Sequence, residues 1–235
     1  MLADAERRGA SAVYCLGDLI GKGPEGAAAL DWCREACAVV VRGNWDEAVA
    51  RPQTPPSPTL RWHQDELGEA RLHYLGSLPN SFNFTLSGRR VRLLHASPEG
   101  VYKRVHADAS YAELETMFAN TPFTGQGNEE PDVVGYGDIH VPYVRTLGKK
   151  ALFNAGSVGN PLDEPQAAYV LLEGELGSPR TAAFALQVVR VPYDVERAVA
   201  VAAEMGMPEL EAYATELRTA VYRAFHAQVA DTSAD

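Results

Sequence analysis

Along the first half of the chain, strand-like apolar runs alternate with segments in which apolar residues recur at a helical period. Aliphatic and β-branched runs at 12–18 and 38–44 follow stretches at 2–10 and 25–37 in which apolar residues recur every three or four positions. Strands that alternate with helices in this way are typical of a parallel sheet with crossover helices. The pattern therefore predicts an α/β fold that opens with a helix closed at Gly9.

The second half changes to a period of two. Segments 81–96 and 141–157 read as hairpins that turn at Ser87-Gly88 and Gly148-Lys149. Further strands are expected at 132–138, 167–175 and 183–193, helices at 63–78, 110–120, 194–206 and 208–230, and a proline-rich surface loop at 51–62. We expect one domain over 1–235, with two mixed sheets face to face, helices outside and the helical segment 193–235 packed on it.

Composition limits the partners and the compartment. The chain has 31 Asp and Glu against 21 Lys and Arg, a net charge of −10, which argues against a nucleic-acid polymer or an anionic membrane as partner. It contains no 18-residue apolar run and no signal peptide, so a soluble, cytoplasmic protein is expected. The three cysteines form no CxxC pair, which favours buried thiols in a reducing compartment.

Five polar side chains follow apolar, strand-like runs, and all five are potential metal ligands. They are Asp18, Asn44, His95, Asp138 and His140. Asp, Asn and His at the ends of successive strands are the ligands from which a hydrolytic metal site is built. Asp138 and His140 are two residues apart on a strand end, so their side chains should point the same way.

The segments that carry these residues, in their order, resemble the calcineurin-like metallophosphoesterases, in particular a small bacterial branch of phosphodiesterases and phosphatases. They read GDLIGKGP, GNWDE, LLHASP, GDIHVP and NAGSVGNP. The resemblance covers nearly the whole chain and implies a four-layer α/β/β/α sandwich. It also implies hydrolysis of phosphate mono- or diesters by a metal-bridging hydroxide, with a small phosphoester or nucleotide as substrate. A homo-oligomer is compatible with it.

Three departures from the family pattern affect the expected metal centre. The family's first strand ends in Asp-x-His, and this chain lacks that motif. A start placed too far downstream is the simplest explanation, and a real loss of the strand is the alternative. Asp138 replaces a common His, which shifts the expected ion from zinc toward manganese, iron or magnesium, with manganese favoured. Trp45 replaces a His that serves many relatives as leaving-group acid, so another group must supply that proton or the substrate must need none.

The resemblance implies roles for individual residues. Asp18 would bridge two cations. The first would also bind Asn44, His95 and Asp138, and the second would bind His140 but lack its remaining ligands. One divalent ion should therefore bind better than two. Asn44 would also contact the substrate phosphate.

Other assignments are weaker. Asp46 is a catalytic candidate or holds its loop, and Lys22 and His106 are weaker candidates for substrate contact. Asn154 and Ser157 either hydrogen-bond to the site or form a structural turn. His63, His73 and His226 read as surface residues. A degenerate, non-catalytic relative that binds metal or phosphate, with a regulatory or interaction role, is the alternative function.

Overall fold

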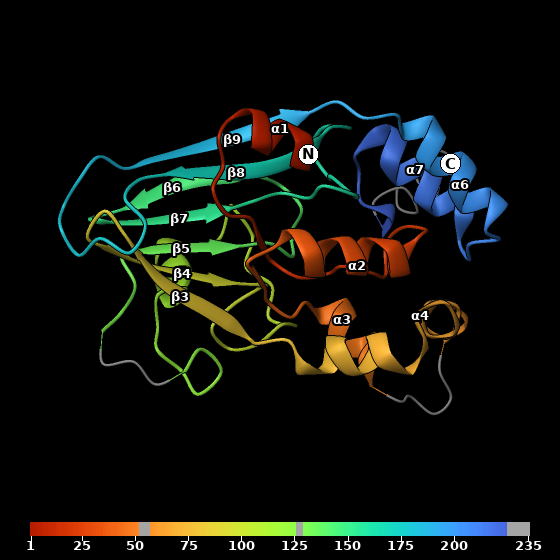
Figure 1. The fold of residues 1–235 in the computed structure, drawn as a ribbon, viewed down its shortest axis with the longest axis horizontal. Helices are drawn as coiled ribbons and strands as arrows, with labels where there is room; N and C mark the ends of the chain where they lie inside the picture. Colours follow the sequence, from red (N-terminus) through yellow and green to blue (C-terminus); the bar gives the residue numbers. More distant parts are fainter. Residues whose placement is uncertain (52–56, 126–128, 225–235) are drawn as a thin grey trace, which may run out of the picture.

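Helices and strands alternate through the first half of the chain, and strands dominate the second half (Figure 1). The computed structural model describes residues 1–51, 57–125 and 129–224. The first half contains α1 (Leu2–Arg7), β1 (Tyr14–Cys15), α2 (Gly26–Ala36), β2 (Val39–Val40), α3 (Asn44–Ala50), α4 (Pro58–Ser77), β3 (Ser81–Leu86), β4 (Arg89–Leu94) and α5 (Tyr111–Thr116). The second contains β5 (Val133–Tyr136), β6 (Tyr143–Leu147), β7 (Lys150–Asn154), β8 (Ala167–Glu173), β9 (Ala185–Val191), α6 (Val195–Glu204) and α7 (Leu210–Thr219).

A mixed five-stranded sheet of order β3-β4-β5-β7-β6 forms the centre of the molecule. Strands β4, β5 and β7 run parallel, and the antiparallel edges β3 and β6 are added through the two predicted hairpins. Ser87 and Gly88 both have positive φ, as a two-residue hairpin loop favours. Successive side chains point to opposite faces, so Leu93 and Phe153 face one core while Leu94 and Leu152 face another, under α5.

A second β layer packs on the Phe153 face of this sheet. It consists of the parallel pair β1–β2 and the antiparallel hairpin β8–β9. Helices α2, α3 and α4 cover the outer side of β1–β2, where Leu30, Val49 and Leu67 surround Val40. The order of layers is therefore helix, sheet, strands, helices, and the predicted α/β/β/α sandwich is confirmed.

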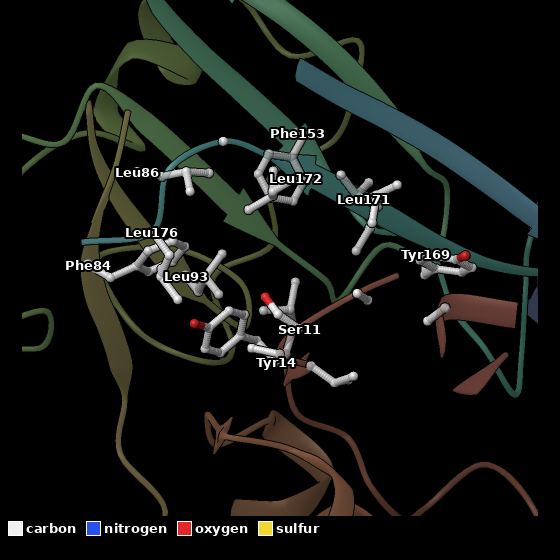
Figure 2. Close-up of a pocket in the computed structure, with 18 of the residues that line it drawn as sticks. Ser11, Tyr14, Phe84, Leu86, Leu93, Phe153, Tyr169, Leu171, Leu172 and Leu176 are labelled. Carbon is white, nitrogen blue, oxygen red and sulfur yellow. The ribbon is translucent and has the colours of Figure 1, made fainter. Parts of the chain in front are cut away.

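The second layer is divided by a groove of about 180 Å³ between β1 and β8 (Figure 2). Phe84, Leu93 and Phe153 of the five-stranded sheet form its floor, and Tyr14 and Leu171 stand on opposite walls. Among the described residues, β1 pairs only with β2 and β8 only with β9. The expected second sheet is thus two strand pairs with an open strand position between them.

Two helices differ from the sequence prediction near residue 50. Helix α3 occupies a stretch that the hydrophobic pattern does not mark as helical. Its start is set by Gly43 at the N-cap, whose N–H donates a hydrogen bond to the Asp46 carboxylate. Helix α4 begins at Pro58, inside the predicted loop 51–62. Ser57 caps it by accepting from Leu60 N–H at 3.2 Å, and Pro58 occupies the first turn. Residues 52–56 of that loop lie outside the described residues.

The C-terminal helices also end earlier than predicted. Helix α7 stops at Thr219 because Ala220 turns into the left-handed region, with φ of 52°. The buried Glu216 carboxylate then accepts from Arg223 N–H at 2.8 Å and from its guanidinium at 2.7 Å, which folds the chain back. Trp62 of α4 packs against the core shared by α6 and α7. Residues 225–230 of the predicted helix lie outside the described part.

No helix in the described residues is long and apolar enough to cross a membrane. The three cysteines are free thiols, and hydrogen bonding to Cys15 raises the pKa of Cys33 to about 12. A thiol with so high a pKa is a poor nucleophile.

His63 was expected on the surface and is instead fully buried. The ring lies edge-on to Trp62 at 4.9 Å and to Trp45 at 6.3 Å between centroids. Neither ring nitrogen has a hydrogen-bond partner among the described atoms. Burial lowers the pKa of His63. The helical period around residue 63 gave no sign of burial because Trp45, on α3, reaches this face only in the folded chain.

This burial predicts a loss of stability in acid. Folded His63 binds a proton less readily than the unfolded residue, so the free energy of unfolding should fall as the pH drops below about 6.5. Urea denaturation of His63→Leu at several pH values should show a shallower fall than the wild type between pH 7 and 5. His73→Leu, exposed in the part of α4 that follows a kink at Gly68, is the control and should keep the wild-type slope. Equal slopes for both variants and the wild type would contradict the prediction.

Candidate metal centre

Two turns, Gly17-Asp18 after β1 and Gly43-Asn44 after β2, meet at the carboxyl edge of the parallel pair. They can touch because each contains a glycine: a Cβ on Gly43 would lie 2.1 Å from Asp18 Oδ1, and one on Gly17 would lie 2.5 Å from Gly43 N. Asp18 has a φ of 55°, and its Oδ1 accepts from Trp45 N–H at 2.9 Å. The contact fixes Asp18 and Asn44 side by side.

The Asp46 carboxylate ties the two turns together from beneath. It is fully buried, and it accepts hydrogen bonds from Asp18 N–H and Gly43 N–H at 2.8 Å and from Leu19 N–H at 3.0 Å. Burial, followed by the charge of Asp18, raises the pKa of Asp46 to about 7. Because these backbone donors engage both carboxylate oxygens, the geometry gives Asp46 a positioning role.

His95, directly after β4, presents one ring nitrogen to a group of oxygens. Its Nδ1 lies 2.7 Å from the carbonyl oxygen of Leu16, which can only accept, so Nδ1 carries hydrogen. Its Nε2 lies 3.0 Å from Asn44 Oδ1, 3.5 Å from Asp18 Oδ1 and 3.9 Å from Asp138 Oδ1. Four of the five residues predicted as metal ligands therefore converge here.

The segment after β5 contributes Asp138 and His140 from a backbone in the left-handed region. Their φ angles are 55° and 60°, a conformation that costs a non-glycine residue about 1–3 kcal/mol. His140 donates from Nδ1 to the Asn160 carbonyl at 2.6 Å, which leaves Nε2 without hydrogen in the neutral ring. Burial lowers the pKa of His140, and the charges of Asp18 and His95 also act on it. His140 therefore shares the turn that carries Asp138.

The NAGSVGNP loop supports these residues through hydrogen bonds. Asn154 donates to the Gly137 carbonyl and accepts from Gly156 N–H at 2.9 Å, so it braces the turn that carries Asp138. Ser157 Oγ accepts from Asn160 N–H at 3.0 Å, and Asn160 in turn holds His140. Asn160 was not predicted; its carbonyl acts through the backbone, which no side-chain pattern indicates.

Arg104 is a second residue that the sequence did not indicate. Its Nε and Nη2 lie 2.9 and 3.0 Å from the two oxygens of Asp138, in a bidentate pair. The loop that carries it is anchored by its neighbour: Val105 is buried, and its carbonyl accepts from Tyr136 OH at 2.7 Å. Arg104 reaches the centre from a loop, where sequence periodicity carries no information.

The predicted substrate contacts differ in their placement. Lys22 is half-buried, with its ammonium 5.6 Å from the Trp45 ring centre and 5.7 Å from that of Tyr222. Burial lowers the pKa of Lys22, and the charge of Asp18 is among those that act on it. His106 is exposed on the surface loop next to Val105. Its role as a substrate contact stays a prediction.

Residues 1–176 match the model of the calcineurin-like phosphoesterase superfamily domain. The chain belongs to this superfamily. An uncharacterized protein of Methanocaldococcus jannaschii is 24% identical over an alignment length of 237, which covers 89% of this chain and 87% of that protein.

Two solved structures share the fold of this calcineurin-like phosphoesterase. A metallophosphoesterase from Sphaerobacter thermophilus superposes with a TM-score of 0.69 at 21% identity, over 94% of both chains. A hypothetical protein from Pyrococcus horikoshii superposes with a TM-score of 0.70 at 16% identity, over 94% of this chain and 90% of the other.

Calcineurin-like phosphoesterases generally depend on divalent cations, and the donor set of this chain fits one. Among the residues described, no group of three or more His, Cys, Asp or Glu side chains has the spacing of a metal site. Both His95 and His140 nevertheless donate one ring N–H to a backbone carbonyl, as metal-binding histidines almost always do. The other nitrogen of His95 faces acceptor oxygens, and a cation is the partner that such a group of acceptors lacks.

Proposed function

We propose that this chain is a metal-dependent phosphoesterase that hydrolyses phosphate mono- or diesters, with manganese as the favoured ion. The observation that supports this best is the convergence of Asp18, Asn44 and Asp138 oxygens on His95 Nε2. Asp and Asn oxygens with one imidazole form a hard, mixed donor set that suits manganese, iron or magnesium.

Each residue has a defined task in this proposal. Asp18, Asn44, His95 and Asp138 would hold one ion, while Asp18 and His140 would begin a second set. When bound, a divalent cation supplies Lewis acidity and lowers the pKa of water toward neutrality. The Asn44 amide and the Lys22 ammonium would orient the phosphoryl group, and Asp46 would keep the two turns in register. Because the second set is partial, one ion should bind more tightly than a second.

A substrate panel tests the proposal. Protein freed of metal with a chelator and resupplied with Mn²⁺ should hydrolyse p-nitrophenyl phosphate or bis(p-nitrophenyl) phosphate, and calorimetry should show one tight Mn²⁺ site. Binding of Mn²⁺ without hydrolysis of either compound would favour the non-catalytic alternative, which the partial second set supports. Failure to bind Mn²⁺ would contradict both functions.

Trp45 predicts a preference for good leaving groups. Indole cannot donate a proton usefully at neutral pH, so alkyl monoesters should react slowly compared with aryl esters. Trp45→His should raise kcat/KM for an alkyl monoester at least about tenfold, since a positioned general acid contributes about 10²–10⁴, and should change aryl esters little. Trp45→Phe is the control, because it keeps a ring against Gly21 and adds no proton donor. A similar gain on both ester classes would contradict the prediction.

A further inference from the structure

The Asp138 carboxylate, a predicted metal ligand, is engaged by an arginine. Arg104 binds both of its oxygens, and the Asp138 side chain is only 4% exposed while that of Arg104 is 46% exposed. Asp138 Oδ1, 3.9 Å from His95 Nε2, is the same oxygen that Arg104 Nη2 contacts at 3.0 Å. One oxygen therefore serves two positive partners: the guanidinium as observed and the cation of the proposed function.

These two partners compete on electrostatic grounds. A buried carboxylate without a counter-charge is costly, so Arg104 stabilises Asp138 when no ion is bound. A divalent ion on Asp138 would neutralise the carboxylate and repel the guanidinium, which weakens the pair. The Arg104 side chain is half-exposed although the backbone of its loop is anchored at Val105, so the guanidinium has solvent to turn into when the pair weakens.

A second cation stands nearby. Lys22 is half-buried against two aromatic rings, and no carboxylate lies within salt-bridge distance of it among the residues that the structure describes. The Trp45 ring that Lys22 overlies belongs to the residue whose backbone N–H donates to Asp18 Oδ1, which places the ammonium beside the same centre. Arginine matches phosphate oxygens in a planar fork, and lysine adds a point charge.

We propose that Arg104 is the counter-ion of Asp138 in the metal-free protein and, together with Lys22, forms a subsite for a phosphoryl dianion once the metal is bound. This inference rests on the proposed function and narrows its substrate class. Two cations favour the dianion of a phosphomonoester over the monoanion of a diester. With Trp45 in place of an acid, the preferred substrate is a monoester whose leaving group departs as a stable anion.

Calorimetric titrations test this exchange of Arg104 between Asp138 and the phosphoryl group. They compare the wild type with Arg104→Ala, Arg104→Lys and the control Arg218→Ala. Arg218 pairs with Glu196 on the exposed surface of the C-terminal helices, which makes it a matched ion pair away from the centre. Arg104→Ala should bind Mn²⁺ roughly tenfold more tightly than the wild type, because a charge-assisted contact no longer competes with the ion. In the Mn²⁺-loaded protein, the same variant should bind inorganic phosphate roughly tenfold more weakly, because it lacks the charge-assisted contact between the guanidinium and the phosphate.

The opposite changes expected in Mn²⁺ affinity and phosphate affinity distinguish this role from a structural one. If Arg104 only maintains the loop, Arg104→Ala should weaken both Mn²⁺ and phosphate, and that result would overturn the inference. Arg104→Lys should recover part of the phosphate affinity, and Arg218→Ala should resemble the wild type in both titrations. Equal Mn²⁺ affinities in the wild type and Arg104→Ala, with hydrolysis intact in the wild type, would overturn the exchange but leave the proposed function standing. A wild type that binds no Mn²⁺ would overturn both.

Discussion

Asp18→Asn should abolish Mn²⁺-dependent hydrolysis and weaken Mn²⁺ binding at least about a hundredfold. Residues that merely support metal ligands typically contribute 10- to 100-fold to affinity, so loss of a ligand charge should cost at least the upper end of that range. Asn keeps the shape of the side chain and leaves an acceptor for Trp45 N–H, so the turn should survive. Calorimetry with Mn²⁺ and the rate with p-nitrophenyl phosphate measure the two effects.

Asp65→Asn is the matched control for this substitution. Asp65 is exposed on α4, and the same change of charge there should leave both Mn²⁺ affinity and rate unchanged. Near-wild-type activity of Asp18→Asn in the presence of manganese would show that the metal-dependent hydrolase proposal is wrong.

Asp46→Ala should have the largest effect on stability. It removes the acceptor of three backbone N–H groups beneath the two turns and leaves them without a partner in a buried position. At about 1–3 kcal/mol for each unsatisfied donor, and with some relaxation of the turns, the free energy of unfolding should fall by about 3 kcal/mol. Mn²⁺ affinity should fall too, because Asp18 loses the bond that fixes its backbone. Urea denaturation and calorimetry measure the two quantities.

Asp46→Asn separates the hydrogen bonds from the charge. Its amide keeps one acceptor oxygen, so it should lose less stability than Asp46→Ala. Asp194→Ala, which removes only the cap of the exposed α6 N-terminus, provides a comparison in which stability falls and Mn²⁺ affinity does not. Unchanged stability in Asp46→Ala would mean that the turns do not depend on this carboxylate.

Much of the fold followed from local pattern. The β3–β4 and β6–β7 hairpins were predicted because alternation and turn residues are read within a few positions, and the superfamily was identified from short segments in a fixed order. Helix α3 and the end of helix α7 were missed for a different reason. The first depends on Asp46 meeting the Gly43 N–H, and the second on Arg223 returning to the buried Glu216.

The residues of the candidate centre also fall into two groups, those that the local pattern predicts and those that tertiary contacts place. Asp18, Asn44, His95 and Asp138 follow strand ends, and the sheet brings such ends together, so their convergence could be expected. Arg104 and Asn160 lie in loops, where position depends on anchors such as Tyr136 and on backbone carbonyls that carry no sequence signal. His63 shows the same limit, because its burial comes from rings that surround it only in the folded chain.

The groove between β1 and β8 bears on how the protein behaves when it is concentrated. Unpaired strand edges are a template for edge-to-edge aggregation, and most native proteins cover or interrupt them. Here the described residues present such a template in the folded state, with Phe84 and Phe153 at its base. Self-association should therefore increase with protein concentration at temperatures well below the unfolding transition, which light scattering at constant temperature would detect. For this chain, colloidal stability and thermal stability are separate properties, and a buffer chosen for one need not serve the other.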